Sequence, residues 1–167
     1  MAFVILQQVS SPHAKANARK TLDKPVALKY LTEYFTSDEY ESLKKKFPNE
    51  VFYIWGAKLE RGHQIPKMIP NKSLVLFRRG QRVFRLGAIH ALFVKPELAE
   101  YLWGVDEYGE TWSIVYMLSR VRDVSFPMCE VNQVIGRKST DNWQGMTALE
   151  GESAELAIAY IKQHIGK

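Results

Sequence analysis

Residues 73–94, SLVLFRRGQRVFRLGAIHALFV, contain two apolar runs separated by a glycine and a glutamine. A short connection that begins with glycine is typical of the turn between two antiparallel strands. The pattern therefore predicts a hairpin of two strands, at 73–79 and 82–94. Gly87 interrupts the second run, and a glycine inside a strand often marks a β-bulge.

The flanking sequence adds further strands and helices. Short apolar runs predict strands at 51–55, 111–118 and 120–126. Capping residues, glycines and prolines predict helices at 13–23, 26–35, 41–47 (with Ser37 and Asp38 as caps), 96–103, 128–135 and 151–165, and a loop at 139–149. About five strands joined mostly by hairpins, with helices between them, indicate an α+β fold with a strongly curved sheet or β-barrel flanked by helices.

We expect one domain over residues 1–167. Its parts are a helical N-terminal arm (1–50) packed on the barrel, a barrel core with inserted helices (51–150) and a C-terminal helix (151–167) capped by Ser153. The chain begins with a short apolar run that no basic residue precedes, so it is a poor signal peptide. A strand or an expression artefact is the expected interpretation of this run.

The composition is that of an ordinary globular protein, with 46% hydrophobic and 25% charged residues among 167. No segment is long and apolar enough to span a membrane, so no membrane partner is expected. Cys129 is the single cysteine, which excludes an internal disulfide and fits a reducing, cytoplasmic location. We expect its thiol to be buried rather than nucleophilic.

The charge is distributed unevenly around a net value of +5. Residues 58–85 contain eight basic residues and one acidic residue, whereas residues 97–110 contain five acidic residues and no basic one. A local basic excess of this kind is typical of a surface that binds phosphate backbones, although a solvated basic face is the alternative. The candidate phosphate-binding residues are Lys58, Arg61, Lys67, Lys72, Arg78, Arg79 and Arg82.

The sequence contains no convincing catalytic cluster. The four histidines have no partners at metal-ligand spacing, and neither a phosphate-binding glycine loop nor a GxSxG elbow is present. Asp38, Glu41 and Lys44 resemble a nuclease set, but they lie on an expected surface helix, where solvated charge is the simpler interpretation. We therefore expect a binding domain with no catalytic residue, cofactor or metal.

The four tryptophans, Trp55, Trp103, Trp112 and Trp143, all lie at the predicted ends of strands or helices or in loops. Each one taken alone is more simply explained as a core residue, but we expect that not all four are. Aromatic side chains beside a basic strip are what base stacking requires. A base taken out of the duplex would need such a pocket, with polar atoms for its Watson–Crick edge.

Several segments, in this order, resemble a known group of domains: VFYIWG, a basic loop, the hairpin, LAEYLWGVDEYGETWSIVYML, VRDVSFP and WQGMTAL. They resemble the PUA-like group that includes EVE and YTH domains. They are most similar to the reader domains of methylation-dependent restriction enzymes of the McrBC and HNH types, over about residues 15–165. The resemblance implies a curved barrel that binds nucleic acid and accepts one flipped, often methylated, base in an aromatic cage.

By the same resemblance, the cage tryptophans match Trp55 and Trp112, with Trp103 and Tyr108 as further walls. Asp106 is then a candidate acceptor for an exocyclic amine, and Gln144 a candidate donor or acceptor. The YTH branch usually has a serine or asparagine near its first tryptophan. Gly56 follows Trp55 here, so the polar contacts of the pocket must differ.

The resemblance implies a reader of double-stranded DNA that carries N6-methyladenine or 5-methylcytosine. Such a domain is the specificity module of a modification-dependent restriction system, fused to or associated with an AAA+ motor or a nuclease. The alternatives are an RNA-binding module of the same superfamily, a small nuclease, and a protein-interaction domain whose tryptophans are plain core residues.

Overall fold

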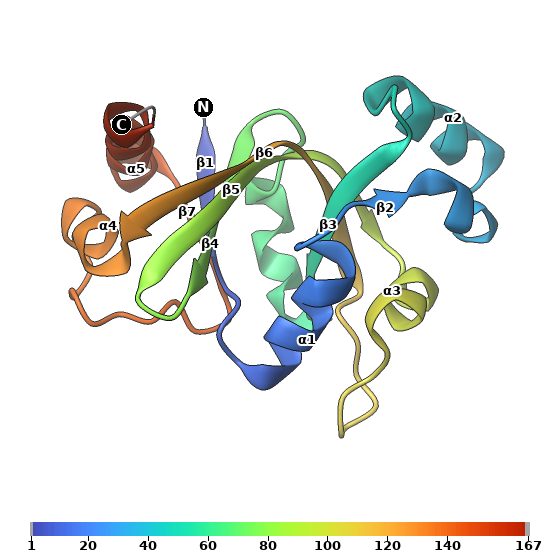
Figure 1. Cartoon of the computed structure of the whole chain (residues 1–167), viewed down its shortest axis with the longest axis horizontal. Helices are drawn as coiled ribbons and strands as arrows, with labels where there is room; N and C mark the ends of the chain where they lie inside the picture. Colours follow the sequence, from blue (N-terminus) through green and yellow to red (C-terminus); the bar gives the residue numbers. More distant parts are fainter. Residues whose placement is uncertain (1, 166–167) are drawn as a thin grey trace.

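The predicted hairpin lies inside a seven-stranded sheet in the computed structural model, which describes residues 2–165 (Figure 1). The order across the sheet is β2-β3-β6-β5-β4-β1-β7. All neighbours are antiparallel except the parallel pair β1 and β4. The strands are β1 (Phe3–Gln8), β2 (Val26–Ala27), β3 (Val51–Ala57), β4 (Ser73–Arg79), β5 (Arg82–Val94), β6 (Ile114–Pro127) and β7 (Met146–Leu149).

The longest strands bend the sheet. The pairing of β5 with β6 shifts register at three places, one of which spans Gly87. A bulge at Gly87 was predicted, and a Cβ there would lie 3.1 Å from Val121, so the close packing favours glycine. The mixed α+β class and the curved sheet are confirmed. Closure into a barrel is not, because the terminal strands β2 and β7 do not pair within residues 2–165.

Three strand predictions need correction. The N-terminal arm is helical only in part: its apolar run is strand β1, one of the two interpretations given above, which lies between β4 and β7 with its first five residues buried. The two strands predicted at 111–118 and 120–126 form a single strand, β6, because Arg120 takes a positive φ of 53° without ending it. The predicted loop at 139–149 contains edge strand β7.

The helices cover both faces and the ends of the sheet. They are α1 (Pro12–Thr21), α2 (Ser37–Lys46), α3 (Pro96–Trp103), α4 (Met128–Val134) and α5 (Gly151–His164), with the 3-10 helices η1 (Leu28–Tyr30), η2 (Thr32–Tyr34) and η3 (Leu59–Lys67). None of the described helices is long and apolar enough to cross a membrane. Residues 166–167, assigned above to the C-terminal helix, lie outside the described residues.

Several helix ends also differ from the prediction. The helix expected at 26–35 is instead the short strand β2 followed by two 3-10 turns, whose three-residue repeat directs both Leu28 and Leu31 into the core. Thr36 rather than Ser37 or Asp38 caps α2: its hydroxyl accepts from the Glu39 N–H, and the Glu39 carboxylate accepts from the Thr36 N–H, which completes a capping box. In α5 the cap is Glu150, and Ser153 instead donates to the Glu150 carbonyl.

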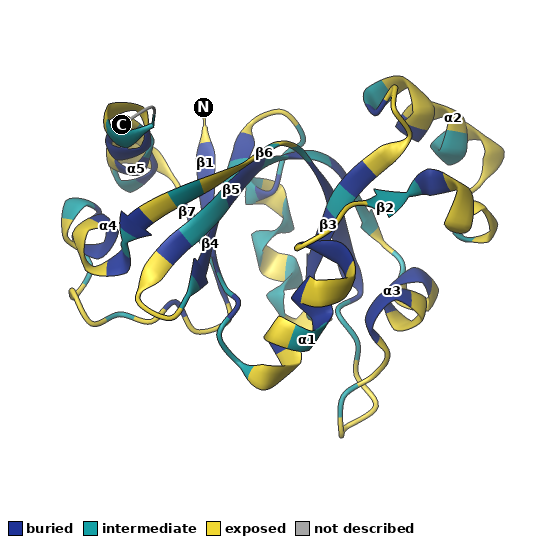
Figure 2. Ribbon diagram, viewed as in Figure 1, coloured by how far each residue is buried: buried dark blue, intermediate teal, exposed yellow. Residues whose placement is uncertain are grey.

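Alternate residues of each strand enter different core clusters, as the two-residue repeat of a strand requires. Val4 and Leu6 pack with α4 and α5, whereas Ile5 packs with α1 on the other face. Val115 and Met117 contact α3, whereas Tyr116 lies with Ile5. Figure 2 shows the buried residues concentrated along the strands and on the inner faces of the helices. The residues of β1, β3 and β6 are therefore held rigidly from both sides.

Candidate nucleic-acid interface

A cavity of about 250 Å³ lies where the curved sheet brings distant strands together. Its wall comes from the end of β1, the end of β3 and the segment leading into β7, which are sixth, second and seventh in the sheet order. The N-terminal end of α1, the start of η3 and Trp112 complete it. The lining residues are Gln7, Gln8, Ser11, His13, Trp55, Gly56, Ala57, Lys58, Glu60, Arg61, Trp112, Gly145 and Met146.

Trp55 and Trp112 both line this cavity. Trp55 is 1% exposed, and its ring centroid is 4.9 Å from that of Trp112, with the two planes at 62°. Trp112 is half-buried just before β6, and His13 meets it edge-on at 5.5 Å. The two indoles form a corner, in which a flat ligand can stack on one ring and contact the other.

Trp103 supports this corner from behind and does not line the cavity. It is 4% exposed, and its Nε1 donates to Thr21 Oγ1 at 3.0 Å. Its ring packs on Gly56, where a Cβ would come within 2.8 Å of the indole and 2.7 Å of the Ile114 carbonyl. Glycine after Trp55 is therefore required by the close approach of Trp103.

Asp106 and Tyr108 belong to a loop that projects from the body between α3 and β6 (Figure 1). Asp106 Oδ1 accepts from the backbone N–H groups of Tyr108 and Glu110, and Oδ2 accepts from Lys58 Nζ at 2.9 Å. The Lys58 hydrogen bond lowers the pKa of Asp106 to about 2, and the same bond raises the pKa of Lys58. Asp106 organises the loop, whereas Tyr108 is 79% exposed, and neither residue lines the cavity.

Gln144 is exposed and lies beside the cavity without lining it. The next residue, Gly145, does line it; its φ is +67°, and a Cβ there would overlap the Arg61 guanidinium. Trp143 is fully buried, and its Nε1 donates to Asn132 Oδ1 at 2.7 Å. Three of the four tryptophans are thus buried, and Trp112 is the half-exposed one.

Four lining residues near the start of the chain were missed by the sequence analysis: Gln7, Gln8, Ser11 and His13. Gln7 is 5% exposed, and its Nε2 donates to Tyr116 Oη at 3.0 Å. Burial raises the pKa of Tyr116, so its hydroxyl remains protonated at neutral pH. The available signal was two glutamines ending the apolar run FVILQQ.

The fold splits the seven predicted phosphate-binding residues into two groups. Lys58 and Arg61 line the cavity, and the β4–β5 turn lies at the same end of β1, since Gln8 pairs with Arg78. Lys72 lies at the other end, where its carbonyl accepts from Phe3 N–H. Phe3 is four residues from Gln7, or roughly 13 Å along a strand. Lys67 is also at that far end, paired with Glu150 at 3.2 Å.

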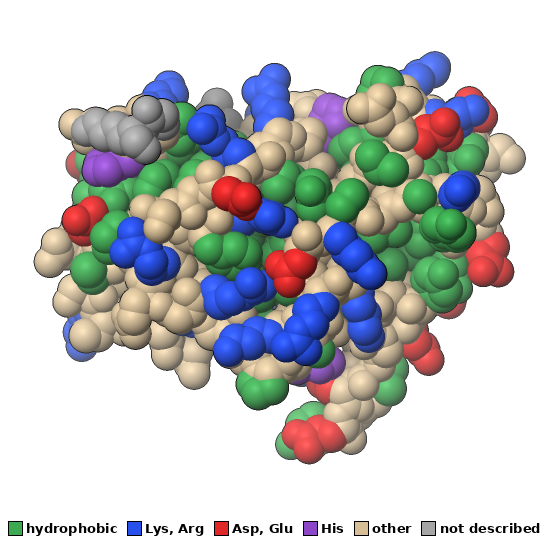
Figure 3. All heavy atoms as spheres, in the orientation of Figure 1, with side chains coloured by type: hydrophobic (Ala, Val, Ile, Leu, Met, Phe, Trp, Pro, Cys, Tyr) green, Lys and Arg blue, Asp and Glu red, His purple; other side chains and the backbone are tan. Residues whose placement is uncertain are grey.

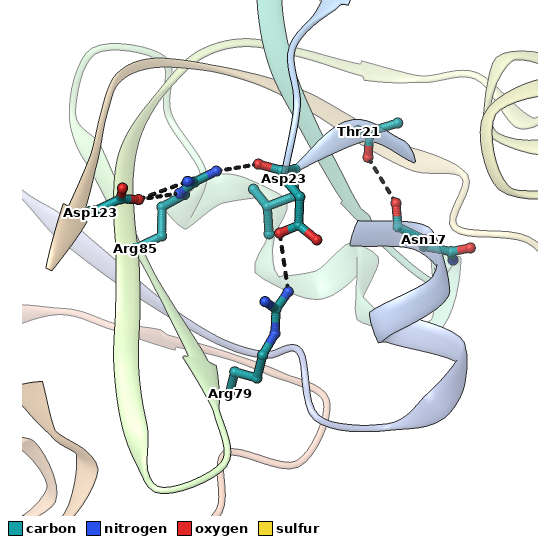
Figure 4. A network of polar contacts seen from close by, with 7 residues as sticks. Asn17, Thr21, Asp23, Arg79, Arg85 and Asp123 are labelled. Atoms are coloured by element: carbon teal, nitrogen blue, oxygen red, sulfur yellow. Dashed lines mark hydrogen bonds and ion pairs between the residues drawn. The ribbon is translucent and has the colours of Figure 1, made fainter. Parts of the chain in front are cut away.

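At the turn itself, the arginines have structural partners. Arg78 is 8% exposed, donates to Ser10 Oγ and the Gly80 carbonyl, and has a pKa lowered by burial. Arg79 pairs with Asp23 at 3.2 Å, and Arg82 donates to Ser125 while remaining exposed. Figure 4 shows how Arg79 and Arg85 connect the hairpin to the end of α1.

Helix α1 adds basic charge that the sequence analysis did not assign. Lys15, Arg19 and Lys20 are exposed on it. Figure 3 shows basic side chains gathered over α1 and beside the β4–β5 hairpin. Because α1 begins at the cavity, this basic surface continues from the cavity opening.

The described residues show no metal-binding group of three or more histidine, cysteine, aspartate or glutamate side chains. Cys129 is exposed, so the prediction that it is buried is wrong: it lies on the outer face of α4, whose neighbours Met128 and Val131 enter the core. Asp38, Glu41 and Lys44 lie on α2, away from the cavity.

No family model and no curated protein match this chain. Among solved structures it is similar to the N-terminal domain of Thermococcus gammatolerans McrB bound to m5C DNA. The two chains superpose with a TM-score of 0.71 over 97% of this chain and 98% of the other, at 16% sequence identity. At that identity the similarity establishes a shared fold, and the fold is that of the McrB-type domain named in the sequence analysis.

Proposed function

We propose that this chain is a DNA-binding domain that recognises a methylated base by accepting it, flipped out of the duplex, into the cavity between Trp55 and Trp112. The observation that carries the proposal is this aromatic corner, which opens beside basic side chains. A fold shared with a domain that binds m5C DNA supports it. In this function Trp112 is the stacking ring and Trp55 the second wall.

The size of the cavity suits one base. Its volume of about 250 Å³ is many times the ~10–15 Å³ that a single water needs by the same measure, so it can admit a ligand much larger than water. A base that stacks on an aromatic ring gains ~1–3 kcal/mol. The stacking gain offsets part of the cost of extrusion, which is a few kcal/mol for a paired base.

The preference for a methyl group should be modest. One buried methyl contributes about 0.8 kcal/mol, and a hydrophobic pocket discriminates a single carbon by ~1–3 kcal/mol. Lys58, Arg61, Arg82 and the basic face of α1 would hold the phosphate backbone, and this attraction is independent of sequence and weakened by salt. Methylated and unmodified duplexes therefore share most of their binding energy.

The chain is then the specificity module of a modification-dependent restriction system in the PUA-like group of EVE and YTH domains. An AAA+ motor or nuclease, fused or associated, would carry out the cleavage. The aromatic cavity beside a basic surface supports recognition as the role of this chain.

The test is fluorescence anisotropy with labelled duplexes that differ in one base: 5-methylcytosine, N6-methyladenine or the unmodified base. We expect one methylated duplex to bind about 5- to 100-fold more tightly than its unmodified match. Equal affinities for all duplexes would contradict the reader function. Stronger competition by single-stranded RNA than by duplex DNA would favour an RNA-binding module instead.

A further inference from the structure

Gln7 is a nearly buried polar side chain whose carbonyl oxygen the protein leaves unused. It is 5% exposed, lines the cavity, and follows a run of buried apolar residues in β1. Its amide Nε2 donates to Tyr116 Oη at 3.0 Å. None of the described residues donates to its Oε1. This oxygen is not among the fully buried side-chain atoms that lack a partner, so it is accessible in the cavity wall and can accept a hydrogen bond from a ligand or a water.

The neighbouring Gln8, in contrast, uses its side-chain oxygen for structural hydrogen bonds. It also lines the cavity, but its Oε1 accepts from the N–H groups of Ser10 and Ser11, at 2.8 and 3.1 Å. These bonds hold the turn into α1. Gln7 has no comparable backbone bond from its side chain among the described residues, so Gln8 shapes the wall while Gln7 presents an acceptor to whatever enters.

We propose that Gln7 Oε1 accepts a hydrogen bond from the exocyclic amine of the flipped base, so that the cavity selects amino bases over keto bases. This inference rests on the proposed function. Cytosine and adenine each carry an amine donor beside a ring nitrogen that accepts, whereas thymine and guanine present a carbonyl beside an N–H. A glutamine amide held with its oxygen toward the cavity matches the first pattern and opposes the second.

Tyr116 is the positioning residue for this contact. It is fully buried on β6, and its hydroxyl holds Gln7 Nε2. The bond restrains the Gln7 side chain in the orientation that leaves Oε1 free at the cavity wall. Without it the amide can rotate by half a turn and present its NH₂ group to a carbonyl. The base preference therefore depends on a hydroxyl that does not itself touch the base.

The test compares 5-methylcytosine with thymine, each placed opposite guanine in the same duplex. The two bases share ring size and the 5-methyl group, so they differ only in the polar edge that Gln7 reads. The mismatched thymine leaves the stack at lower cost, but that advantage belongs to the DNA and is equal for every variant. The ratio of the two dissociation constants, compared between variants, isolates the amide.

Gln7→Leu should reduce the preference for 5-methylcytosine over thymine about 10-fold, mostly through weaker binding of 5-methylcytosine. Gln7→Glu should keep or increase the preference, because a carboxylate accepts from the cytosine amine and repels a carbonyl. Tyr116→Phe should reduce it about 3-fold, through the freed amide. Gln144→Leu is the matched control, an exposed glutamine outside the cavity wall, and should leave the ratio unchanged.

If Gln7→Leu folds and its ratio of dissociation constants for thymine and 5-methylcytosine is unchanged, the inference is overturned. If Gln7→Leu does not fold, the two other variants decide. An unchanged ratio in Tyr116→Phe together with a reduced preference in Gln7→Glu would then overturn it. The proposed function fails separately, when the unmodified chain binds 5-methylcytosine and cytosine duplexes equally. If the proposed function fails in this way but the preference for 5-methylcytosine over thymine still depends on Gln7, the amide contact is supported without the methyl recognition.

Discussion

The cavity and the tip of the β4–β5 hairpin use their polar side chains in opposite ways. At the tip, two arginines that the sequence predicts to bind phosphate have partners within the protein: Arg78 donates to Ser10 and Arg79 pairs with Asp23. In the cavity, Gln7 keeps an acceptor that no described residue occupies. The difference shows that residue type locates a surface, whereas the accessibility and the partners of each polar atom indicate which groups can still bind a ligand.

The largest effect should come from the buried side of the cavity. Trp55→Ala removes a fully buried indole, and such a truncation costs ~3–5 kcal/mol of the free energy of unfolding. Urea denaturation followed by circular dichroism measures this loss. A variant as stable as the unmodified chain would show that Trp55 is not part of the rigid wall.

Trp112→Ala should act mainly on binding, because this indole is only half-buried. Losing one stacking surface should weaken binding of the methylated duplex by ~1–3 kcal/mol and remove the methyl preference. Tyr108→Ala is the aromatic control: its ring is 79% exposed on the projecting loop, and its removal should leave the preference intact. If anisotropy showed instead that Tyr108→Ala removes the methyl preference and Trp112→Ala retains it, the recognition site would be the loop and not the cavity.

Arg82→Ala tests whether the hairpin contributes to binding of the phosphate backbone. Its guanidinium is exposed at the cavity end of the sheet and, within residues 2–165, hydrogen-bonds to Ser125 alone, so its charge is available to a phosphate. Its loss should weaken all duplexes alike and reduce the slope of log affinity against log salt by ~0.9. Lys72→Ala, at the far end of β1, should leave the slope unchanged. Equal effects of the two variants would place the DNA on a different face.

Asp106 should give the smallest effect, visible as a pH dependence. Its folded-state pKa of about 2 lies below the usual 3.8, so its contribution to stability is complete above about pH 4 and is lost as the pH falls toward 2. Asp106→Asn should be less stable than the unmodified chain at pH 6, and the difference should shrink between pH 4 and 2. Denaturation at several pH values measures this, and a constant difference would contradict the Lys58 and backbone bonds as its origin.

Local patterns foretold much of the fold. The hairpin, the bulge at Gly87 and the positions of α1, α3, α4 and α5 follow from glycine, proline and apolar spacing, which act over a few residues. The parallel pairing of β1 with β4 joins residues about 70 positions apart, and no local signal encodes it. The strand β7 is only four residues long and gains its structure from pairing with β1.

The sequence predicted only part of the candidate site, because local patterns identify residue types but not the packing of distant strands. Trp55, Trp112, Lys58 and Arg61 were selected by residue type and do line one cavity. Of the remaining cage candidates, Trp103 and Asp106 have structural roles, and Tyr108 and Gln144 lie outside the cavity wall. Gln7 and His13 belong to the N-terminal segment, which the sequence analysis treated as a helical arm. Burial and hydrogen-bond partners separate these cases, and both depend on the packing of distant strands.

The central claim is that a methylated base enters the corner of Trp55 and Trp112. The most direct measurement is nuclear Overhauser contact between a ¹³C-labelled 5-methyl group of 5-methylcytosine, in a duplex bound to the chain, and the indole protons of the two tryptophans. The account predicts contacts to both rings, with those to position 112 lost in Trp112→Ala. Contacts only to neighbouring bases would mean that the base stays in the helix, and would contradict the claim.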